Sequence, residues 1–125
     1  MKQVSIDTHA LLWYITNDKR LPQVDRDILK AASRVFVPTI VLLELLYLLQ
    51  KRGRIQMFSL ILNRLKKFRK YSVVALDLAI LGEVPKYSLK LEMHDAIIVV
   101  TAKVLNLPLV TKDETIQKVY KNTIW

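Results

Sequence analysis

Short apolar segments alternate with longer helical patterns along this 125-residue chain. Helical patterns occupy residues 8–16, 22–33, 39–52, 54–70, 78–84, 93–105 and 114–120. The segments with the length and β-branched content of buried strands are residues 3–6 (QVSI), 34–38 (RVFVP), 72–76 (SVVAL) and 107–111 (LPLVT), with the final NTIW as a candidate edge strand. Strands alternating with helices predict βαβ units, and therefore an α/β fold whose parallel sheet is covered on both faces.

Two of the predicted helices differ in their apolar pattern. The 39–52 segment is rich in Leu and apolar on nearly all sides, so we expect it to be buried. The 54–70 segment is amphipathic, with apolar residues at intervals of three and four: Ile55, Phe58, Leu62, Leu65 and Phe68. No repeat, low-complexity tract or linker interrupts the chain, so we expect residues 1–125 to form a single domain.

Composition narrows the possible chemistry. The chain has no Cys, which excludes disulfides, thiolate zinc sites, iron–sulfur clusters and a Cys nucleophile, so any metal ion must have oxygen or imidazole ligands. Its net charge of +9 favours a polyanionic partner. The N-terminus does not resemble a signal peptide, and no apolar run reaches the roughly 18 residues of a membrane span. We therefore expect a cytoplasmic protein without membrane contact.

Most of the acidic residues fall into two groups. Those in polar or helix-terminal surroundings are expected at the solvated surface: Asp18, Asp25, Asp27, Glu83 and Glu114. Five others stand in apolar sequence: Asp7, Glu44, Asp77, Asp95 and Asp113. Because an unpaired buried carboxylate is strongly destabilising, each of these five needs a partner or a purpose.

Helix capping explains some of these five acids. Asp77 stands between a strand and a helix, where its carboxylate can cap the helix. Asp7 also stands at a strand-to-helix junction, and Thr111 and Glu114 around Asp113 have the spacing of a capping box. For Asp7 and Asp113, capping and function both stay open on these grounds.

Glu44 and Asp95 have no local explanation. Glu44 is the only charged residue between Pro38 and Lys51, and no basic residue stands three or four positions from it. Asp95 opens an apolar helix, and Glu92, expected at a solvated rim, has the same charge on the same helix face. Each carboxylate needs a cation from elsewhere in the fold.

A parallel sheet brings these acids together. Ligands of open α/β sheets bind beyond the carboxyl ends of the strands, where Asp7 and Asp113 stand and where the first turns holding Glu44 and Asp95 are expected. Four carboxylates in one cleft repel one another unless a hard divalent ion, such as Mg²⁺ or Mn²⁺, binds among them. An acidic metal site in a basic protein suits metal-assisted hydrolysis of a phosphodiester.

Four segments together resemble a known family. In this order and at these separations, SIDTHALLWY, TIVLLELLYLL, EMHDAIIVVTAK and LVTKDETI resemble a PIN-domain ribonuclease, specifically the VapC-type toxin of a toxin–antitoxin pair. The resemblance covers the whole chain, down to the final IW. It implies a three-layer α/β/α sandwich around a parallel sheet and a divalent-metal-dependent endoribonuclease. The family's acidic quartet falls on Asp7, Glu44, Asp95 and Asp113.

The resemblance also implies a role for each member of the quartet. Asp7 and Asp95 would be the principal ligands of Mg²⁺ or Mn²⁺. Glu44 would hold the ion or a bound water, or accept a proton from that water. Asp113 would complete the site, often through water. Since all four are present, we expect an active enzyme.

Neighbouring residues complete the expected site. Thr8 and Thr111 resemble the hydroxyl residues that support the acids in the family. Ile116 stands where some relatives carry a further acid, so the number of metal ions stays open. His9 and His94 lack the spacing of paired histidine ligands, and we expect secondary roles for them.

Two surfaces suggest partners. Residues 51–70 hold 8 of the 20 basic residues, which form a solvated helix face, contact RNA phosphates, or do both. The apolar surplus in residues 41–49 and 57–62 suggests an association surface. The resemblance implies a homodimer and a cognate VapB-like antitoxin that places a helix in an apolar groove and an Arg at the acids. The candidate RNA contacts are Lys51, Arg52, Arg54, Arg64, Lys66, Lys67, Arg69 and Lys70.

Three alternatives to the toxin remain. The first is a PIN-domain nuclease of RNA processing without an antitoxin. The second is a non-catalytic RNA-binding module that uses the basic face alone. The third is a phosphoacceptor receiver domain, in which Asp77 would have to be the acceptor after a central strand.

Overall fold

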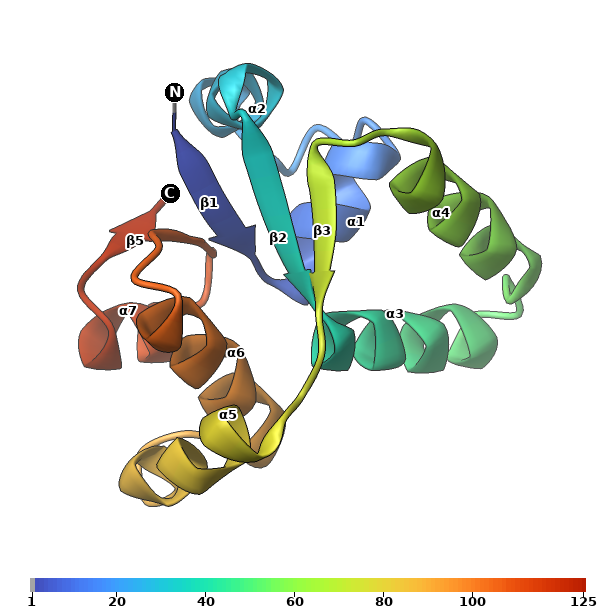
Figure 1. The fold of residues 1–125 in the computed structure, drawn as a ribbon. Helices are drawn as coiled ribbons and strands as arrows, with labels where there is room; N and C mark the ends of the chain where they lie inside the picture. The colour runs from blue at the N-terminus through green and yellow to red at the C-terminus, as the bar shows by residue number, and fades with distance from the viewer. Residues whose placement is uncertain (1) are drawn as a thin grey trace.

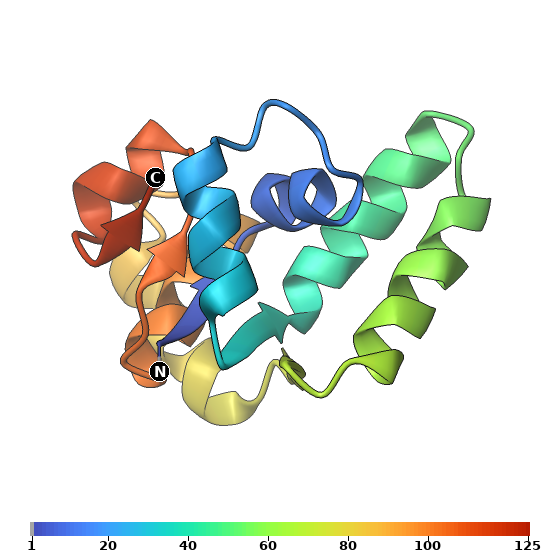
Figure 2. The ribbon, with the colours of Figure 1, turned by 90° about the horizontal axis from the view of Figure 1, so that it is seen from above.

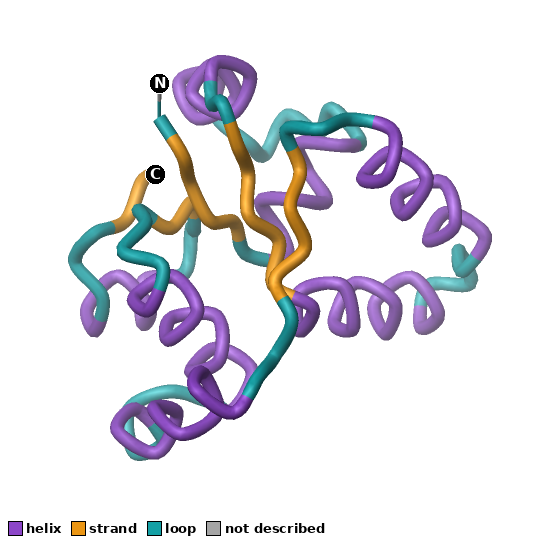
Figure 3. Tube along the Cα trace, in the orientation of Figure 1, coloured by secondary structure: helices purple, strands orange, loops and turns teal. Residues whose placement is uncertain are grey.

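The computed structural model describes residues 2–125 and contains one five-stranded sheet. Every strand pair is parallel, and the order across the sheet is β3-β2-β1-β4-β5 (Figures 1 and 3). The strands are β1 (Gln3–Ile6), β2 (Arg34–Pro38), β3 (Tyr71–Val74), β4 (Leu109–Val110) and β5 (Thr123–Ile124). The predicted α/β class and all five predicted strands are confirmed.

Helices connect the strands as predicted. They are α1 (Thr8–Ile15), α2 (Gln23–Ala31), α3 (Thr39–Lys51), α4 (Gln56–Lys67), α5 (Leu78–Glu83), α6 (Met93–Val104) and α7 (Glu114–Val119), with the 3₁₀ turn η1 (Val84–Tyr87) after α5. The chain crosses the sheet one way from β1 to β3 and returns from β3 to β5. Because such crossovers are right-handed, α1–α4 and α5–α7 cover opposite faces, which gives three layers (Figures 1 and 2).

Two strands are shorter than the sequence predicts, for local reasons. β3 ends at Val74 because its neighbour β2 ends at Pro38, the residue that pairs with Val74. β4 starts only at Leu109, since the Leu107 N–H already bonds the carbonyl of Ala102 at the end of α6. Pairing partners and helix ends therefore set these limits.

Three helices end at a residue with a left-handed backbone. Asn17 (φ 55°), Gly53 (φ 68°) and Asn106 (φ 54°) follow the ends of α1, α3 and α6. After Gly53, the Arg54 N–H donates to the Leu49 carbonyl at 2.8 Å. This bond satisfies a free carbonyl of the last helical turn and reverses the chain direction.

The expectation that the 39–52 helix is buried on nearly all sides is wrong. Only Val41, Leu45 and Leu49 of α3 are buried, whereas Leu43 and Tyr47 are 61% and 64% exposed. The structure explains this exposure, because α3 and α4 extend together away from the sheet as a hairpin (Figures 1 and 2). Only the α3 face toward the core is covered.

The apolar stripe predicted for α4 is also only partly correct. Of the predicted stripe, Leu65 is buried, Phe58 and Leu62 are partly buried, and Ile55 and Phe68 at the two ends are exposed. The helix itself runs only from Gln56 to Lys67, so both exposed residues lie outside it. The hairpin therefore presents apolar and basic side chains to solvent together.

One acid assigned to the surface is buried. Asp25 in the first turn of α2 is only 2% exposed, and burial raises the pKa of its carboxyl. Asp18 is partly exposed and pairs with Arg20 at 2.8 Å, which lowers the pKa of Asp18 to about 2.

Within residues 2–125, no helix is both long and apolar enough to cross a membrane.

Candidate active site

The four carboxylates singled out in the sequence line one cleft of about 810 Å³. Asp7 follows β1, Glu44 lies in the second turn of α3, Asp95 in the first turn of α6, and Asp113 follows β4. The convergence expected from a parallel sheet is therefore present. What these acids bind stays a prediction.

Asp7 is the most firmly held of the four. Its carboxylate caps α1 by accepting the Ala10 N–H at 3.0 Å, and its other oxygen accepts the Thr111 hydroxyl. The residue is only 8% exposed. Burial raises the pKa of Asp7 to about 6, the two hydrogen bonds oppose that rise, and the charges of Asp113 and Asp95 add to it.

Glu44 finds its partners on other elements, as its isolation in the sequence indicates. The Thr8 hydroxyl of α1 donates to Glu44 Oε1 at 2.7 Å. His94 Nε2 of α6 lies 3.2 Å from Glu44 Oε2. Glu44 therefore connects α1, α3 and α6 in the lining of the cleft.

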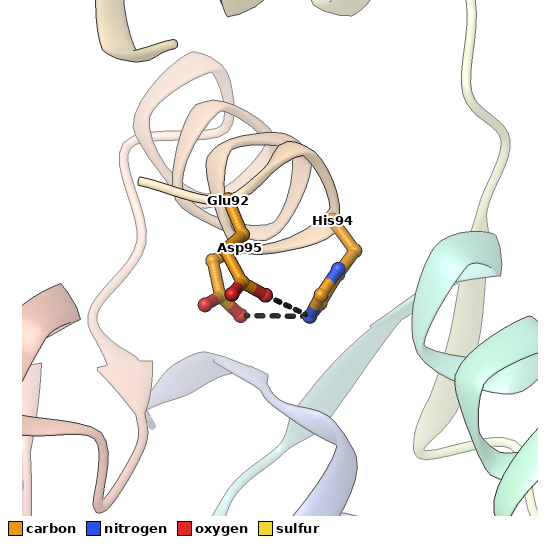
Figure 4. Close-up of side chains that lie close together, drawn as sticks. All are labelled: Glu92, His94 and Asp95. Atoms are coloured by element: carbon orange, nitrogen blue, oxygen red, sulfur yellow. Dashed lines mark ion pairs between the residues drawn. The ribbon is translucent and has the colours of Figure 1, made fainter. Parts of the chain in front are cut away.

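His94 points toward the carboxylates beside it on α6. Its Nε2 lies 3.6 Å from Glu92 Oε2 and 3.7 Å from Asp95 Oδ1 (Figure 4). The ligand atoms of these three residues lie within 4.8 Å of one another, a spacing that allows a shared metal ion. The imidazole therefore lies within 4 Å of three cleft acids, Glu44, Glu92 and Asp95, which extends the secondary role expected for His94.

Asp95 carries the second raised pKa of the site. Its desolvation raises the pKa to about 6, His94 lowers it, and the charges of Asp113, Glu44 and Glu92 raise it further. The ionised forms of Asp7 and Asp95 are therefore both less favourable in the folded protein than in water. A cation in the cleft would stabilise these ionised forms.

Asp113 caps α7, which is one of the two roles that the sequence left open for it. Its Oδ1 accepts the Ile116 N–H at 3.0 Å and caps α7. The predicted capping box of Thr111 and Glu114 is wrong, because the Thr111 hydroxyl instead donates to Asp7 and accepts the Asp113 N–H at 3.1 Å. Thr111 therefore connects two acids of the cleft.

Asp77 is not part of this cleft. Its carboxylate accepts the Ile80 N–H at 2.9 Å and caps α5, as predicted. It follows β3, which is an edge strand, not a central one. The receiver alternative is therefore wrong.

Ile116, at the position of a possible fifth acid, is buried beside the cleft.

No Lys or Arg among residues 2–125 forms an ion pair with the quartet. Within residues 2–125, the ion pairs with Lys or Arg are Arg20 with Asp18 and Lys86 with Glu83. Four cations nevertheless line the cleft: Arg20, Arg52, Lys90 and Lys112. Acids at the centre with basic residues around them suit a metal ion bound to a phosphodiester.

Sequence reasoning missed the aromatic side of the cleft. Trp13 lies in the cleft wall, with Arg20 at 4.9 Å and Lys112 at 5.4 Å from its ring centroid. His9 and Trp125 lie beside the same ring, at 5.6 and 6.0 Å between centroids. The spacing of His9 and Trp13, four residues apart on one face of α1, is the signal that could have indicated this arrangement.

The predicted basic run is divided among different surroundings. Arg52 lines the acid cleft, and Arg54 lines an adjoining pocket. The Lys70 ammonium donates to the Leu29 carbonyl at 2.6 Å, so it stabilises the end of α2. The remaining members are exposed: Lys51, Arg64, Lys66, Lys67 and Arg69.

Comparison with solved structures finds this fold in toxin–antitoxin proteins. A toxin–antitoxin complex from Klebsiella pneumoniae aligns with a TM-score of 0.72 at 16% identity, covering 98% of this chain and 96% of the other. VapBC2 from Rickettsia felis, bound to a promoter DNA fragment, aligns at 0.69 and 18%, with 98% and 96% covered. VapC20 from Mycobacterium tuberculosis, a toxin that cleaves the sarcin–ricin loop, aligns at 0.73 and 11%, with 93% and 94% covered.

Sequence comparison identifies the family. No curated protein matches the chain. The family model described as the PIN domain matches residues 4–122, nearly the whole length. The match agrees with the strand order and with the four converging carboxylates. This chain belongs to the PIN-domain family.

Proposed function

We propose that this protein is a divalent-metal-dependent endoribonuclease that hydrolyses RNA phosphodiester bonds as the toxin of a toxin–antitoxin pair. Residues 1–125 would act as one domain. The observation that carries the proposal is the convergence of Asp7, Glu44, Asp95 and Asp113 in a cleft where no Lys or Arg of residues 2–125 pairs with them. Such a cluster is stable in its ionised form only with a bound cation.

The donor atoms of the cleft fit Mg²⁺ or Mn²⁺, which prefer carboxylate oxygens. Asp7 and Asp95 would hold the ion, and their raised pKa values indicate charge that the protein itself leaves uncompensated. Asp113 would complete the site through water. A divalent ion bound there supplies Lewis acidity and lowers the pKa of a bound water.

The protein's own residues would orient and accept protons. The Thr111 hydroxyl fixes the direction of the Asp7 carboxylate, and Thr8 fixes that of Glu44. Glu44 keeps its second oxygen toward the cleft and His94, where it would hold an attacking water or accept its proton. The surrounding cations would bind the RNA phosphates.

The toxin assignment gains support from the solved neighbours. Two of them are toxin–antitoxin assemblies, and a third cleaves the sarcin–ricin loop. An apolar groove of about 590 Å³ runs along α3 past Leu43 and Tyr47 and opens at Glu44 and His94. We propose that an antitoxin helix binds there, with an Arg directed at the acids, and that the exposed α3 face also contributes to a homodimer.

RNA cleavage by the purified protein tests this function. A mixed structured RNA is incubated with Mn²⁺ or Mg²⁺, and in parallel with a chelator. The Asp95→Asn variant, purified identically, controls for contaminating nuclease. We expect metal-dependent cleavage by the parent protein and none by the variant.

The contrary result would point to the non-catalytic RNA-binding module. If no RNA is cut and neither metal shifts the melting temperature, the cleft binds no catalytic ion and the proposal is wrong. Cleavage by a protein that has no adjacent antitoxin gene would instead favour the RNA-processing nuclease.

A further inference from the structure

A second pocket adjoins the acid cleft. Its volume is about 550 Å³, and it shares the lining residues Trp13, Arg20 and Arg52 with the cleft. It also includes Arg54, and its one acid is Asp18. The two cavities therefore form one continuous depression that is acidic at the cleft and basic at this end, which we call the arginine pocket (Arg20, Arg52 and Arg54).

Arg20 is held rigidly in the arginine pocket. Its Nε and Nη2 donate to the two oxygens of Asp18 at 3.0 and 2.8 Å. The guanidinium lies over the ring of Trp13, 4.9 Å from the centroid. Its remaining N–H groups have no partner within residues 2–125. A planar cation fixed in this way is suited to bind phosphate or stack with a base.

Arg52 and Arg54 reach the same pocket because α3 ends just before them, at Lys51. Gly53, with φ 68°, allows the reversal that the Arg54 N–H stabilises at the Leu49 carbonyl. Both arginines are exposed, and neither pairs with a carboxylate in the described part of the chain. Two unpaired cations thus face a pocket that continues into the acid cleft.

From this continuity we infer that the arginine pocket binds the nucleotides next to the scissile phosphate of a single-stranded RNA. The inference rests on the proposed function, because the acid cleft then holds the phosphate that is cut. The neighbouring phosphates carry negative charge that Arg52 and Arg54 match. An unpaired base can stack on the Arg20 guanidinium, whereas the bases of a duplex are already stacked on each other.

Two double variants with the same charge change test the inference. Arg52→Gln with Arg54→Gln removes two cations of the pocket, whereas Lys30→Gln with Lys121→Gln removes two exposed cations that line neither pocket and are not among the candidate RNA contacts. All four side chains are exposed, so folding is unaffected. Each pair is introduced into the Asp95→Asn background. Binding of a short fluorescein-labelled single-stranded RNA is then measured by anisotropy in Mg²⁺ over a range of salt concentrations.

We expect the pocket variant to bind about tenfold more weakly, with a salt slope smaller by about 1.4, since each phosphate contact with a single strand contributes about 0.7. The control pair changes affinity less than about twofold. The same RNA annealed to its complement binds more weakly than the single strand. Equal losses in the two double variants, no loss in the pocket variant, or no binding by the parent overturns the inference.

Cleavage assays with Asp95 intact separate this inference from the proposed function. If the binding results are as expected but no metal-dependent cleavage occurs, the nuclease proposal fails and the RNA subsite stands. If the protein cleaves RNA but both double variants bind equally well, the subsite is wrong and the nuclease stands.

Discussion

The acid cleft and the α3–α4 hairpin differ in how the protein holds their side chains, although α3 belongs to both. In the cleft, internal hydrogen bonds fix each of Asp7, Glu44 and Asp113. On the hairpin, Leu43 and Tyr47 project into solvent without such bonds. The cleft thus holds its polar side chains in fixed directions, whereas no hydrogen bond fixes the exposed side chains of Leu43 and Tyr47 on the hairpin.

This difference shows where stability and function conflict. The cleft keeps like charges close together and raises two carboxyl pKa values, which destabilises the metal-free protein. The hairpin leaves apolar surface in water, which costs little within the monomer but favours association. Substitutions in the cleft should therefore affect catalysis and stability, and substitutions on the hairpin should affect assembly.

The largest expected effect is on cleavage. Asp7→Asn should lower metal-dependent RNA cleavage by at least about 100-fold, because it removes a negatively charged carboxylate from the proposed site of the divalent ion. The cap on α1 survives, since the Asn oxygen can still accept the Ala10 N–H. Initial cleavage rates in Mn²⁺, alongside circular dichroism, measure this. A variant with full activity would remove Asp7 from the site.

The next effect is on the pH dependence of stability. The pKa of Asp7 in the folded protein, about 6, lies above its ordinary value of 3.8. Folding is therefore favoured by this group below pH 3.8, and that contribution is lost as pH rises through about 6. It amounts to on the order of 3 kcal/mol, at 1.36 kcal/mol for each pKa unit.

Urea unfolding of the metal-free protein at several pH values checks this sign. The parent should lose stability from pH 4 to 7 by roughly this amount, and Asp7→Asn should lose less. Added Mg²⁺ should restore the parent at pH 7 and leave the variant nearly unchanged. Identical pH profiles for the two proteins would show that burial does not raise the pKa of Asp7.

A smaller effect should follow from the hydroxyl that connects two acids. Thr111→Val removes the donor to Asp7 and the acceptor of the Asp113 N–H, which should cost about 1–2 kcal/mol of unfolding free energy and reduce cleavage. Thr111→Ser keeps the hydroxyl and serves as the matched control. If Val and Ser variants cleave RNA equally well, the hydroxyl does not orient the acids.

The smallest effect on stability is expected on the hairpin. Leu43→Gln should change the unfolding free energy by less than about 0.5 kcal/mol, because this side chain is exposed. It should nevertheless weaken self-association, measured by sedimentation velocity. Leu78→Gln, at an exposed position of α5 outside the α3 groove and outside the hairpin, is the control. Equal sedimentation of parent and Leu43→Gln would assign the dimer to another face.

Local patterns predicted most of the fold. The β1 and β2 bounds follow directly from the apolar runs at 3–6 and 34–38, and Asp77 caps its helix as its position indicates. Features that depend on distant partners were not predictable. The end of β3 is set by Pro38 across the sheet, and the exposure of Leu43 by how far the hairpin extends.

The candidate site shows the same limit. Carboxylates in apolar sequence are conspicuous, so the four acids could be selected and their convergence inferred from a parallel sheet. The sequence spacing pairs Thr111 with Glu114, and it could not show that the Thr111 hydroxyl bonds Asp7 instead, because Asp7 is 104 residues away. The stacking of Arg20 and Lys112 on Trp13 likewise exists only in three dimensions.

The strand order has a consequence for protein synthesis. The central strand β1 is made first, yet its partner β4 is made late, and Ser5 pairs with Leu109. During synthesis, the Asp7 carboxylate therefore lacks its hydrogen bond from the Thr111 hydroxyl until the C-terminal part of the chain has been made. A truncated nascent chain cannot assemble the acid cleft, so translation that stops early yields no functional site.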